Sequence, residues 1–184
     1  MSLKNKNIVV GISGSIAAYK SCEIIRLLIK EKAAVIPVMT KNAAEFITPL
    51  TVRTLAKNRV YIDMFADDFD WEAGHISIAK KSDMVLIAPA TANVIAKISS
   101  GIADDALTTI VLSVRRGGCP VVICPAMNSE MYKNPVTQKN ISYLKKTGYR
   151  FVGPEKGELA CGTDDIGRMS EPEKIISEIG KILK

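Results

Sequence analysis

Three side chains of this sequence suit proton transfer or the binding of a polar group, and they are His75, Asn128 and Cys161. His75 is the only histidine, and imidazole is the side chain best matched to proton transfer near neutral pH. A lone histidine is more often a structural or surface residue than a catalyst. If the protein uses a histidine base, His75 is the sole candidate.

Asn128 lies where an expected strand gives way to helix. It follows the apolar, β-branched run Pro120–Ile123 and precedes a helix expected from Asn134 to Lys146. The carboxyl end of a strand is where open α/β sheets hold ligands, and an amide there can both donate and accept hydrogen bonds. The alternative is an Asx turn or helix N-cap, which local evidence alone favours.

Cys161 belongs to the polar stretch from Gly157 to Met169, which contains three glycines and predicts a flexible flap able to close over a ligand. A thiol in such a loop is about as often an accidental surface group as a catalytic one. The other three cysteines are Cys22, Cys119 and Cys124. No C-x-x-C pair occurs, so neither a zinc site nor a disulfide framework is expected, whereas at least one reactive free thiol is.

Short apolar runs alternate with helical segments along the chain. The expected strands are Asn7–Ile12, Ala34–Met39, Asp83–Pro89, Pro120–Ile123 and Tyr149–Val152. This alternation predicts an α/β fold, namely a Rossmann-like (flavodoxin-like) doubly wound parallel sheet with helices on both faces, in three layers. The length suits a single domain over residues 1–184.

The segments that follow these strands are expected to meet at one edge of the sheet. They are Gly11–Ile16, Thr40, Ala88–Val94 and Pro125–Asn128. The glycines and serines of the first turn would let the backbone approach a phosphate at a helix N-terminus, although the spacing is not that of a dinucleotide site. The alternatives are a turn shaped by geometry alone and simple helix capping by Thr91.

Composition limits the class of partner. The net charge is +6, but Lys and Arg are scattered among acids and aromatic residues are only 5%, which argues against nucleic acid. The sequence has no apolar stretch long enough for a bilayer and starts without a signal peptide, so we expect a cytoplasmic protein with no membrane partner. The modest cationic excess suits a phosphorylated small molecule.

Several motifs occur together in a characteristic order. They are Gly14–Ala18, His75–Ile76, Ala88–Asn93, Gly101–Asp105, Pro125–Met131, Ala160–Gly162 and Gly167–Met169. Over nearly the whole chain this ordered set resembles the homo-oligomeric flavin-containing cysteine decarboxylases. The last two motifs are similar to the flap of the branch that decarboxylates 4′-phosphopantothenoylcysteine in coenzyme A biosynthesis.

The resemblance implies bound FMN and a homotrimer, or a multiple of trimers, with flavin sites at subunit interfaces. The positions that match flavin contacts are Gly14, Ser15, Ile16, Thr40, Thr91, Ala92, Asn93, Val94 and Ala126. The resemblance also implies a separate phosphopantothenate-cysteine ligase as a partner, because many bacterial relatives carry that activity as a fused second half.

The family chemistry assigns a role to each of the three side chains named first. The substrate thiol is oxidised to a thioaldehyde with His75 assisting proton removal, and Asn128 orients the carboxylate. The C=S group accepts the electrons released with CO2 and gives an enethiolate. Cys161 then supplies the proton as the reduced flavin returns hydride, which yields 4′-phosphopantetheine.

The sequence departs from the family pattern at three positions. Tyr132 stands where Trp is common, and Thr163 and Asp165 replace an Asp and a Gly often found in the flap. Other family activities remain as alternatives: a lantibiotic-peptide cysteine decarboxylase, a flavin prenyltransferase, or a non-catalytic flavoprotein that regulates a phosphatase. The presence of His75, Asn128 and Cys161 together argues against the regulatory alternative.

Overall fold

A five-stranded parallel sheet forms the centre of the molecule in the computed structural model, which describes residues 3–64, 74–115, 117–160 and 162–183. The strand order is β2-β1-β3-β4-β5, the doubly wound flavodoxin-like order that the alternation of elements predicts. The strands are β1 (Asn7–Ile12), β2 (Ala34–Met39), β3 (Met84–Ala90), β4 (Val121–Pro125) and β5 (Arg150–Phe151).

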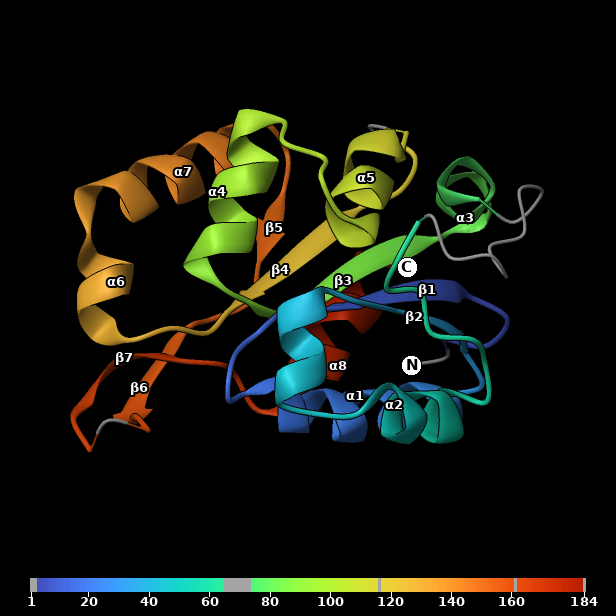
Figure 1. The fold of residues 1–184 in the computed structure, drawn as a ribbon, viewed down its shortest axis with the longest axis horizontal. Coiled ribbons are helices and arrows are strands. Elements are labelled where there is room, and N and C mark those ends of the chain that lie inside the picture. The colour runs from blue at the N-terminus through green and yellow to red at the C-terminus, as the bar shows by residue number, and fades with distance from the viewer. Residues whose placement is uncertain (1–2, 65–73, 116, 161, 184) are drawn as a thin grey trace.

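Helices cover both faces of this sheet (Figure 1). Those on one face are α1 (Ala18–Lys30), α2 (Pro49–Ala56) and α8 (Pro172–Ile182). Those on the other are α3 (His75–Lys81), α4 (Ala92–Ser100), α5 (Ala106–Ser113) and α7 (Pro135–Lys146). The short helices η1 (Lys41–Glu45) and α6 (Ser129–Lys133) begin close after the ends of β2 and β4.

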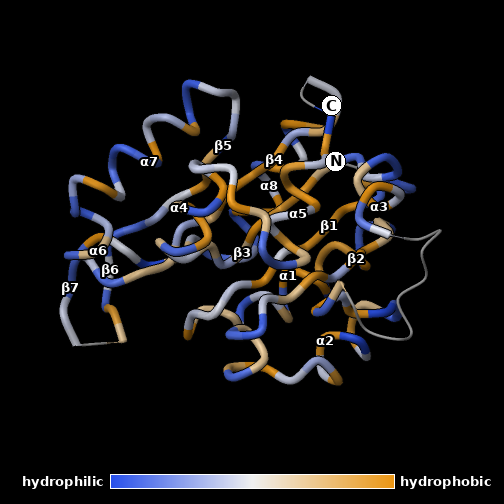
Figure 2. Tube along the Cα trace, turned by 45° about the horizontal axis from the view of Figure 1, so that its top comes forward, coloured by the Kyte–Doolittle hydropathy of each residue, from blue (hydrophilic) through white to orange (hydrophobic). Residues whose placement is uncertain are grey.

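Two hydrophobic cores result because successive residues of a strand point to opposite faces. In β1, Val10 packs with the α1 and α8 side, whereas Val9 packs with the α4 and α5 side. Strands β3 and β4 are buried over their whole length, as expected for parallel strands covered on both faces. Figure 2 shows the hydrophobic residues along β1 in the interior of the molecule.

A β-hairpin lies apart from the main sheet. Strands β6 (Glu155–Glu158) and β7 (Asp164–Arg168) pair antiparallel, and they overlap the stretch from Gly157 to Met169 for which the sequence predicts a flexible flap. The two strands themselves were not predicted. The strands contain few apolar residues, and Figure 2 shows much of the hairpin as hydrophilic, so the alternation that identifies a half-buried strand is absent.

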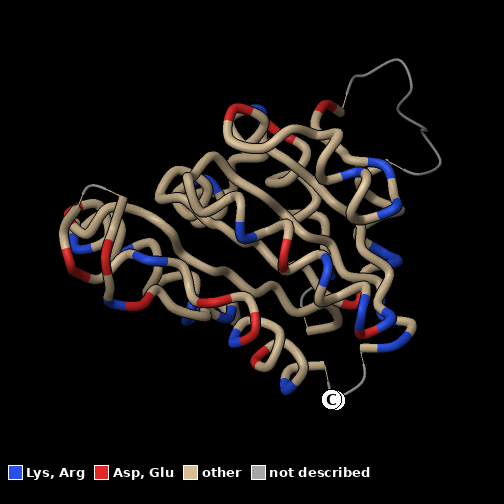
Figure 3. The backbone as a smooth tube through the Cα atoms, turned by 90° about the horizontal axis from the view of Figure 1, so that it is seen from below, with Lys and Arg blue, Asp and Glu red and all other residues tan. Residues whose placement is uncertain are grey.

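The surface mixes charges of both signs. Figure 3 shows Lys and Arg interspersed with Asp and Glu along the trace. No helix in the described ranges has both the length and the apolar character needed to cross a membrane.

Candidate functional site

A cavity of about 670 Å³ opens at the carboxyl ends of β1 and β3, where the strand order reverses. This switch point is the usual ligand position in open α/β sheets. The lining includes five predicted contact residues, which are Gly14, Thr40, Thr91, Asn93 and Val94. The expectation of one shared edge is therefore confirmed for the segments that follow β1, β2 and β3.

Ser13 ties the two strand ends together at this cavity. Its hydroxyl donates to the Pro89 carbonyl at 2.8 Å and accepts from the Thr91 backbone N–H at 3.1 Å. Ser13 is buried, so the satisfied hydroxyl fixes the spacing of the β1 and β3 ends. Ser13 was not predicted as a site residue, because nothing in the local sequence distinguishes it from Ser15 in the same turn.

Gly14 is required by the close approach of η1. A Cβ at this position would lie 2.6 Å from the Cβ of Asn42 and 3.0 Å from its backbone carbonyl carbon and oxygen. Since real carbon contacts are about 3.5–4.0 Å, only glycine fits without movement. Asn42 also lines the cavity and was not predicted, because its proximity to Gly14 arises from packing.

Two predicted contact residues serve as helix caps. The Thr40 hydroxyl accepts from the Ala43 N–H at 3.3 Å, and the Thr91 hydroxyl accepts from the Val94 N–H at 3.3 Å. The capping interpretation of Thr91 is thus confirmed. Both threonines also line the cavity, so the cap places each side chain at its wall.

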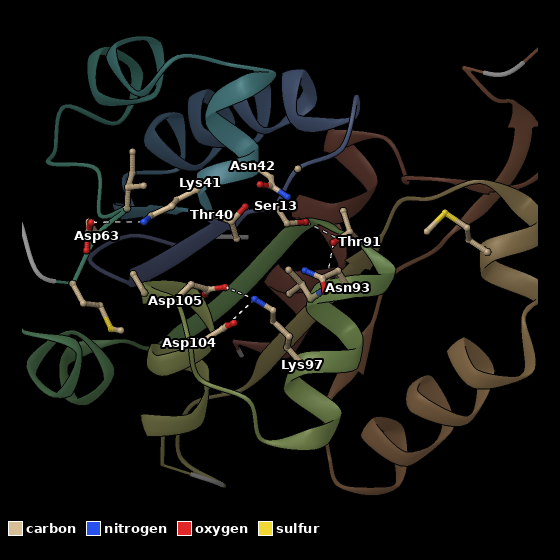
Figure 4. A pocket seen from close by; sticks show the side chains of 16 residues that line it. Ser13, Thr40, Lys41, Asn42, Asp63, Thr91, Asn93, Lys97, Asp104 and Asp105 are labelled. Atoms are coloured by element: carbon tan, nitrogen blue, oxygen red, sulfur yellow. Dashed lines mark hydrogen bonds and ion pairs between the residues drawn. The ribbon is translucent and has the colours of Figure 1, made fainter.

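Ion pairs form the charged part of the cavity wall (Figure 4). The Lys97 ammonium lies 2.7 Å from Asp104 and 3.3 Å from Asp105. The hydrogen bond to Asp104 raises the pKa of Lys97 and lowers that of Asp104, so the pair stays charged near neutral pH. Figure 4 shows Ser13 and Thr40 on the opposite side, where a second ion pair joins Lys41 and Asp63 at 4.0 Å.

A second cavity of about 760 Å³ lies on the other side of the turn that joins β1 to α1. It is bounded by the start of α1, the segment after β4 and the hairpin. The predicted residues in its lining are Ser15, Ile16, Ala126 and Asn128. The hairpin contributes Ala160 and Gly162, which flank Cys161 in the sequence. Cys161 itself lies outside the described residues.

Asn128 fits both interpretations of its position. Its side-chain oxygen accepts from the Glu130 N–H at 2.8 Å and caps α6, as the local pattern favours. The residue is exposed and lines the second cavity. Because the oxygen serves as the cap, the NH2 group is the part of the amide suited to an anionic ligand.

The hairpin is attached directly to the segment that contains Asn128. The Met127 N–H donates to the Gly167 carbonyl at 3.1 Å, and a Cβ on Gly167 would lie only 2.2 Å from the Met127 carbonyl oxygen. Gly167 also has φ of +147°, a conformation that other residues rarely adopt. Asp165, one of the departures from the family pattern, forms an ion pair with Lys133 of α6.

His75 and Ala92 are the first residues of two helices, and Ala92 directly follows the lining residue Thr91. His75 is half-buried at the start of α3, and Ala92 starts α4. Neither is among the described residues that line the two cavities. Helix α3, which His75 begins, packs against α5 on the same face of the sheet.

The three described cysteines are free but poorly suited to reaction. Burial raises the pKa of Cys119 to about 11, and complete burial raises the pKa of Cys124 further. Burial also raises the pKa of Cys22. Since the thiolate is the reactive form, none of these three satisfies the expectation of a reactive thiol. Within the described residues no group of three or more His, Cys, Asp or Glu side chains could hold a metal ion.

The fold and its two cavities define a flavodoxin-like α/β protein with a ligand site at the switch point. The Flavoprotein family profile matches residues 1–184, so the chain belongs to that family, and membership indicates a flavin cofactor.

Relatives extend this assignment. The chain is 46% identical over 176 residues to the coenzyme A biosynthesis bifunctional protein CoaBC of Borreliella burgdorferi, covering 96% of this chain and 44% of that protein. It thus spans less than half the length of this bifunctional relative. A probable phosphopantothenoylcysteine decarboxylase of Streptococcus mutans is 41% identical over 174 residues, which cover 95% of this chain and 97% of that protein.

Solved structures agree in fold. A PPC decarboxylase mutant complexed with pantothenoylaminoethenethiol superposes with a TM-score of 0.83 at 29% identity, covering 97% of this chain and 98% of that one. The FMN-dependent cysteine decarboxylase SpaF also gives a TM-score of 0.83 at 29% identity, covering 99% and 97%. The predicted resemblance to flavin-containing cysteine decarboxylases is therefore confirmed.

Proposed function

We propose that this protein decarboxylates 4′-phosphopantothenoylcysteine to 4′-phosphopantetheine in coenzyme A biosynthesis, with FMN as its cofactor. One observation carries the proposal: the second cavity brings Asn128, the Ser15–Ala17 turn and both neighbours of Cys161 to one space. The similarity to the Streptococcus mutans relative over its full length supports the same substrate.

The residues present fit FMN. The first cavity offers hydroxyl and amide side chains at the switch point, and Gly14 has no Cβ to block a ligand or η1. Helix α1 has no side-chain cap, and although the Ala18 and Lys20 N–H groups donate to the carbonyls of Ser15 and Ala17, the positive end of its dipole suits the phosphate of the cofactor. The proposed contacts are Gly14, Ser15, Ile16, Thr40, Thr91, Ala92, Asn93, Val94 and Ala126, of which Ala92 has the weakest support because it lines neither cavity.

Bound FMN would supply the two-electron oxidation and the later reduction of the substrate, chemistry that amino-acid side chains cannot provide. The side chains bind and move protons. The NH2 group of Asn128 would hold the substrate carboxylate, His75 would accept a proton during oxidation, and Cys161 would donate one to the carbon that loses CO2. A thiol suits that last step because its ordinary pKa of about 8.5 lies near neutral pH.

We propose a homotrimer, and we propose that His75 of one subunit serves the site of the next, because His75 lines neither cavity of its own chain. Ile16 and Tyr19 are 58% and 60% exposed at the second cavity, which suits burial against another subunit. Mixed trimers of His75→Asn and Asn128→Asp chains should regain activity that neither parent has. Verified mixed trimers without recovered activity would contradict the shared site.

A separate phosphopantothenate-cysteine ligase is the proposed partner, since the bifunctional CoaBC relatives are more than twice as long as the matched region. We also propose that the protein acts in the cytoplasm. The free thiols of Cys22, Cys119 and Cys124 are typical of a reducing compartment.

The second candidate is a peptide cysteine decarboxylase, favoured by the equal TM-score to SpaF. Purified protein should release FMN on denaturation and convert 4′-phosphopantothenoylcysteine to 4′-phosphopantetheine and CO2, measured by mass spectrometry. A peptide ending in cysteine is the competing substrate in the same assay. Faster turnover of the peptide would replace the first proposal with the second, and turnover of neither would favour the regulatory alternative.

A further inference from the structure

The β6–β7 hairpin is attached to the rest of the molecule at several levels. At its base, Lys174 lies 2.8 Å from Glu155, and Lys20 donates to Glu171 at 2.9 Å. Farther along β7, the Gly167 carbonyl accepts from the Met127 N–H. The ion pair of Asp165 with Lys133 lies nearest the tip, two residues beyond Gly167.

Asp165 and Gly167 both contact the segment that follows β4, although the register of β7 with β6 shifts at Gly167. The contacted segment is Met127–Lys133, as the close approach of Gly167 to Met127 and the ion pair of Asp165 show. The second oxygen of Asp165 accepts from the Ile166 N–H at 2.7 Å, which fixes the carboxylate toward α6. The pKa of Asp165 is lowered and that of Lys133 is raised, each chiefly by the other.

The two attachments differ in strength. The contact at Gly167 is a backbone hydrogen bond with tight packing, whereas the Asp165 and Lys133 side chains are 29% and 50% exposed. An ion pair of that exposure is partly screened by solvent and salt and is therefore easily broken. Beyond it lie Leu159, Ala160 and Gly162, which line the second cavity and form the hairpin tip.

We propose that the Lys133–Asp165 ion pair is a reversible latch that holds the hairpin tip over the second cavity and controls its opening to substrate. Closing joins the tip to α6, which follows Asn128 directly, so the latch aligns both walls of the cavity. Lys133 and Asp165 are positioning residues that need not touch the substrate. This inference rests on the proposed function only in that the substrate occupies this cavity.

The first test is hydrogen exchange of the flavin-loaded protein without substrate, which does not depend on activity. Asp165→Asn keeps an acceptor for the Ile166 N–H but removes the charge, and Lys133→Gln removes the partner. Either variant should speed exchange in residues 159–166 by about two- to five-fold, the range expected for an exposed ion pair. Lys181→Gln is the matched control, because it breaks the exposed Lys181–Glu178 pair on α8.

Raising the salt concentration from about 0.05 M to about 1 M should speed the same exchange in the unmodified protein and leave both variants unchanged. The charge-swapped pair Lys133→Asp with Asp165→Lys should restore slow exchange. Exchange that is equal in the unmodified protein, both variants and the Lys181→Gln control would overturn the latch, even if decarboxylation is observed.

The second test is kinetic. In both single variants the KM for 4′-phosphopantothenoylcysteine should rise about two- to five-fold. The rate at saturating substrate should change little, because the catalytic groups remain, and a loss confined to that rate would contradict the latch. If no variant and no unmodified protein decarboxylates this substrate, the proposed function fails, while hydrogen exchange still decides the latch.

Discussion

Replacing Gly14 with alanine tests the proposed cofactor site through a contact that only the folded structure creates. The added Cβ would lie 2.6 Å from the Cβ of Asn42, about 1 Å closer than an ordinary carbon contact. A rotamer change of Asn42 cannot relieve the clash, because the other atoms within 3.0 Å belong to its backbone. Either the first turn or η1 must move.

The cost of such overpacking is about 1–3 kcal/mol. Both segments that can move carry proposed FMN contacts, Ser15 in the turn and Thr40 at the start of η1. If the displacement is relieved at the expense of these contacts, the dissociation constant for FMN should rise about 5- to 150-fold, since about 1.4 kcal/mol corresponds to a factor of ten.

The assay is a titration of the apoprotein by quenching of FMN fluorescence, with thermal unfolding to verify the fold. Gly118→Ala is the matched control, because its Cβ would meet nothing closer than Arg115 at 3.5 Å. The control should bind FMN as the unmodified protein does. Equal FMN affinity in Gly14→Ala, Gly118→Ala and the unmodified protein would refute the placement of the cofactor against this turn.

Four further predictions concern the side chains named above. His75→Asn should keep the fold and flavin but lose turnover, because no second histidine is present; near-normal turnover would reject His75 as the base. Cys161→Ser should still oxidise and decarboxylate the substrate, but it should accumulate a product two hydrogens lighter than 4′-phosphopantetheine, as measured by mass spectrometry. The reason is that a hydroxyl is far less acidic than a thiol and cannot supply the last proton. A normal yield of 4′-phosphopantetheine would show that Cys161 is only a loop residue. At pH 8 the native protein should react rapidly with a thiol reagent, and this rapid reaction should disappear in Cys161→Ser. Cys119 should not replace it, because its pKa of about 11 keeps that thiol protonated at pH 8. Unchanged rapid labelling would assign the reactivity to another cysteine. Lys174 lowers the pKa of Glu155, so the ion pair should stabilise the fold above about pH 4.3, and this stabilisation should disappear as the pH falls and Glu155 becomes protonated. Lys174→Gln should therefore lower the melting temperature at pH 7 but not near pH 2. An equal fall in melting temperature at both pH values would contradict the assignment.

The fold could be predicted from local patterns. Continuous apolar runs such as Asn7–Ile12 and Ala34–Met39 become buried parallel strands with the predicted bounds, because only a sheet covered on both faces tolerates such runs. Chain connectivity then places the segments after β1, β2 and β3 at one edge, and Gly14, Thr40 and Thr91 do meet there. The same local rule identifies Asn128 as a helix cap.

Other features depend on packing between distant parts of the chain. The hairpin escaped prediction because hydrophilic strands have no alternating apolar pattern, and Gly167 is held by Met127, which lies 40 positions earlier in the printed sequence. The absence of His75 from the linings of both cavities is likewise a tertiary feature, because it depends on where α3 packs on the sheet.

The sequence by itself determined the class of fold, the edge that bears the site and the family, because these follow from hydrophobic periodicity and ordered motifs. Only the tertiary structure decided that Ser13 bridges β1 and β3, that Asn42 requires glycine at position 14 and that Lys133 pairs with Asp165. Each is a contact between groups far apart in the chain. Its existence depends on distances of a few ångströms set by the packed elements, which no local pattern of residues encodes.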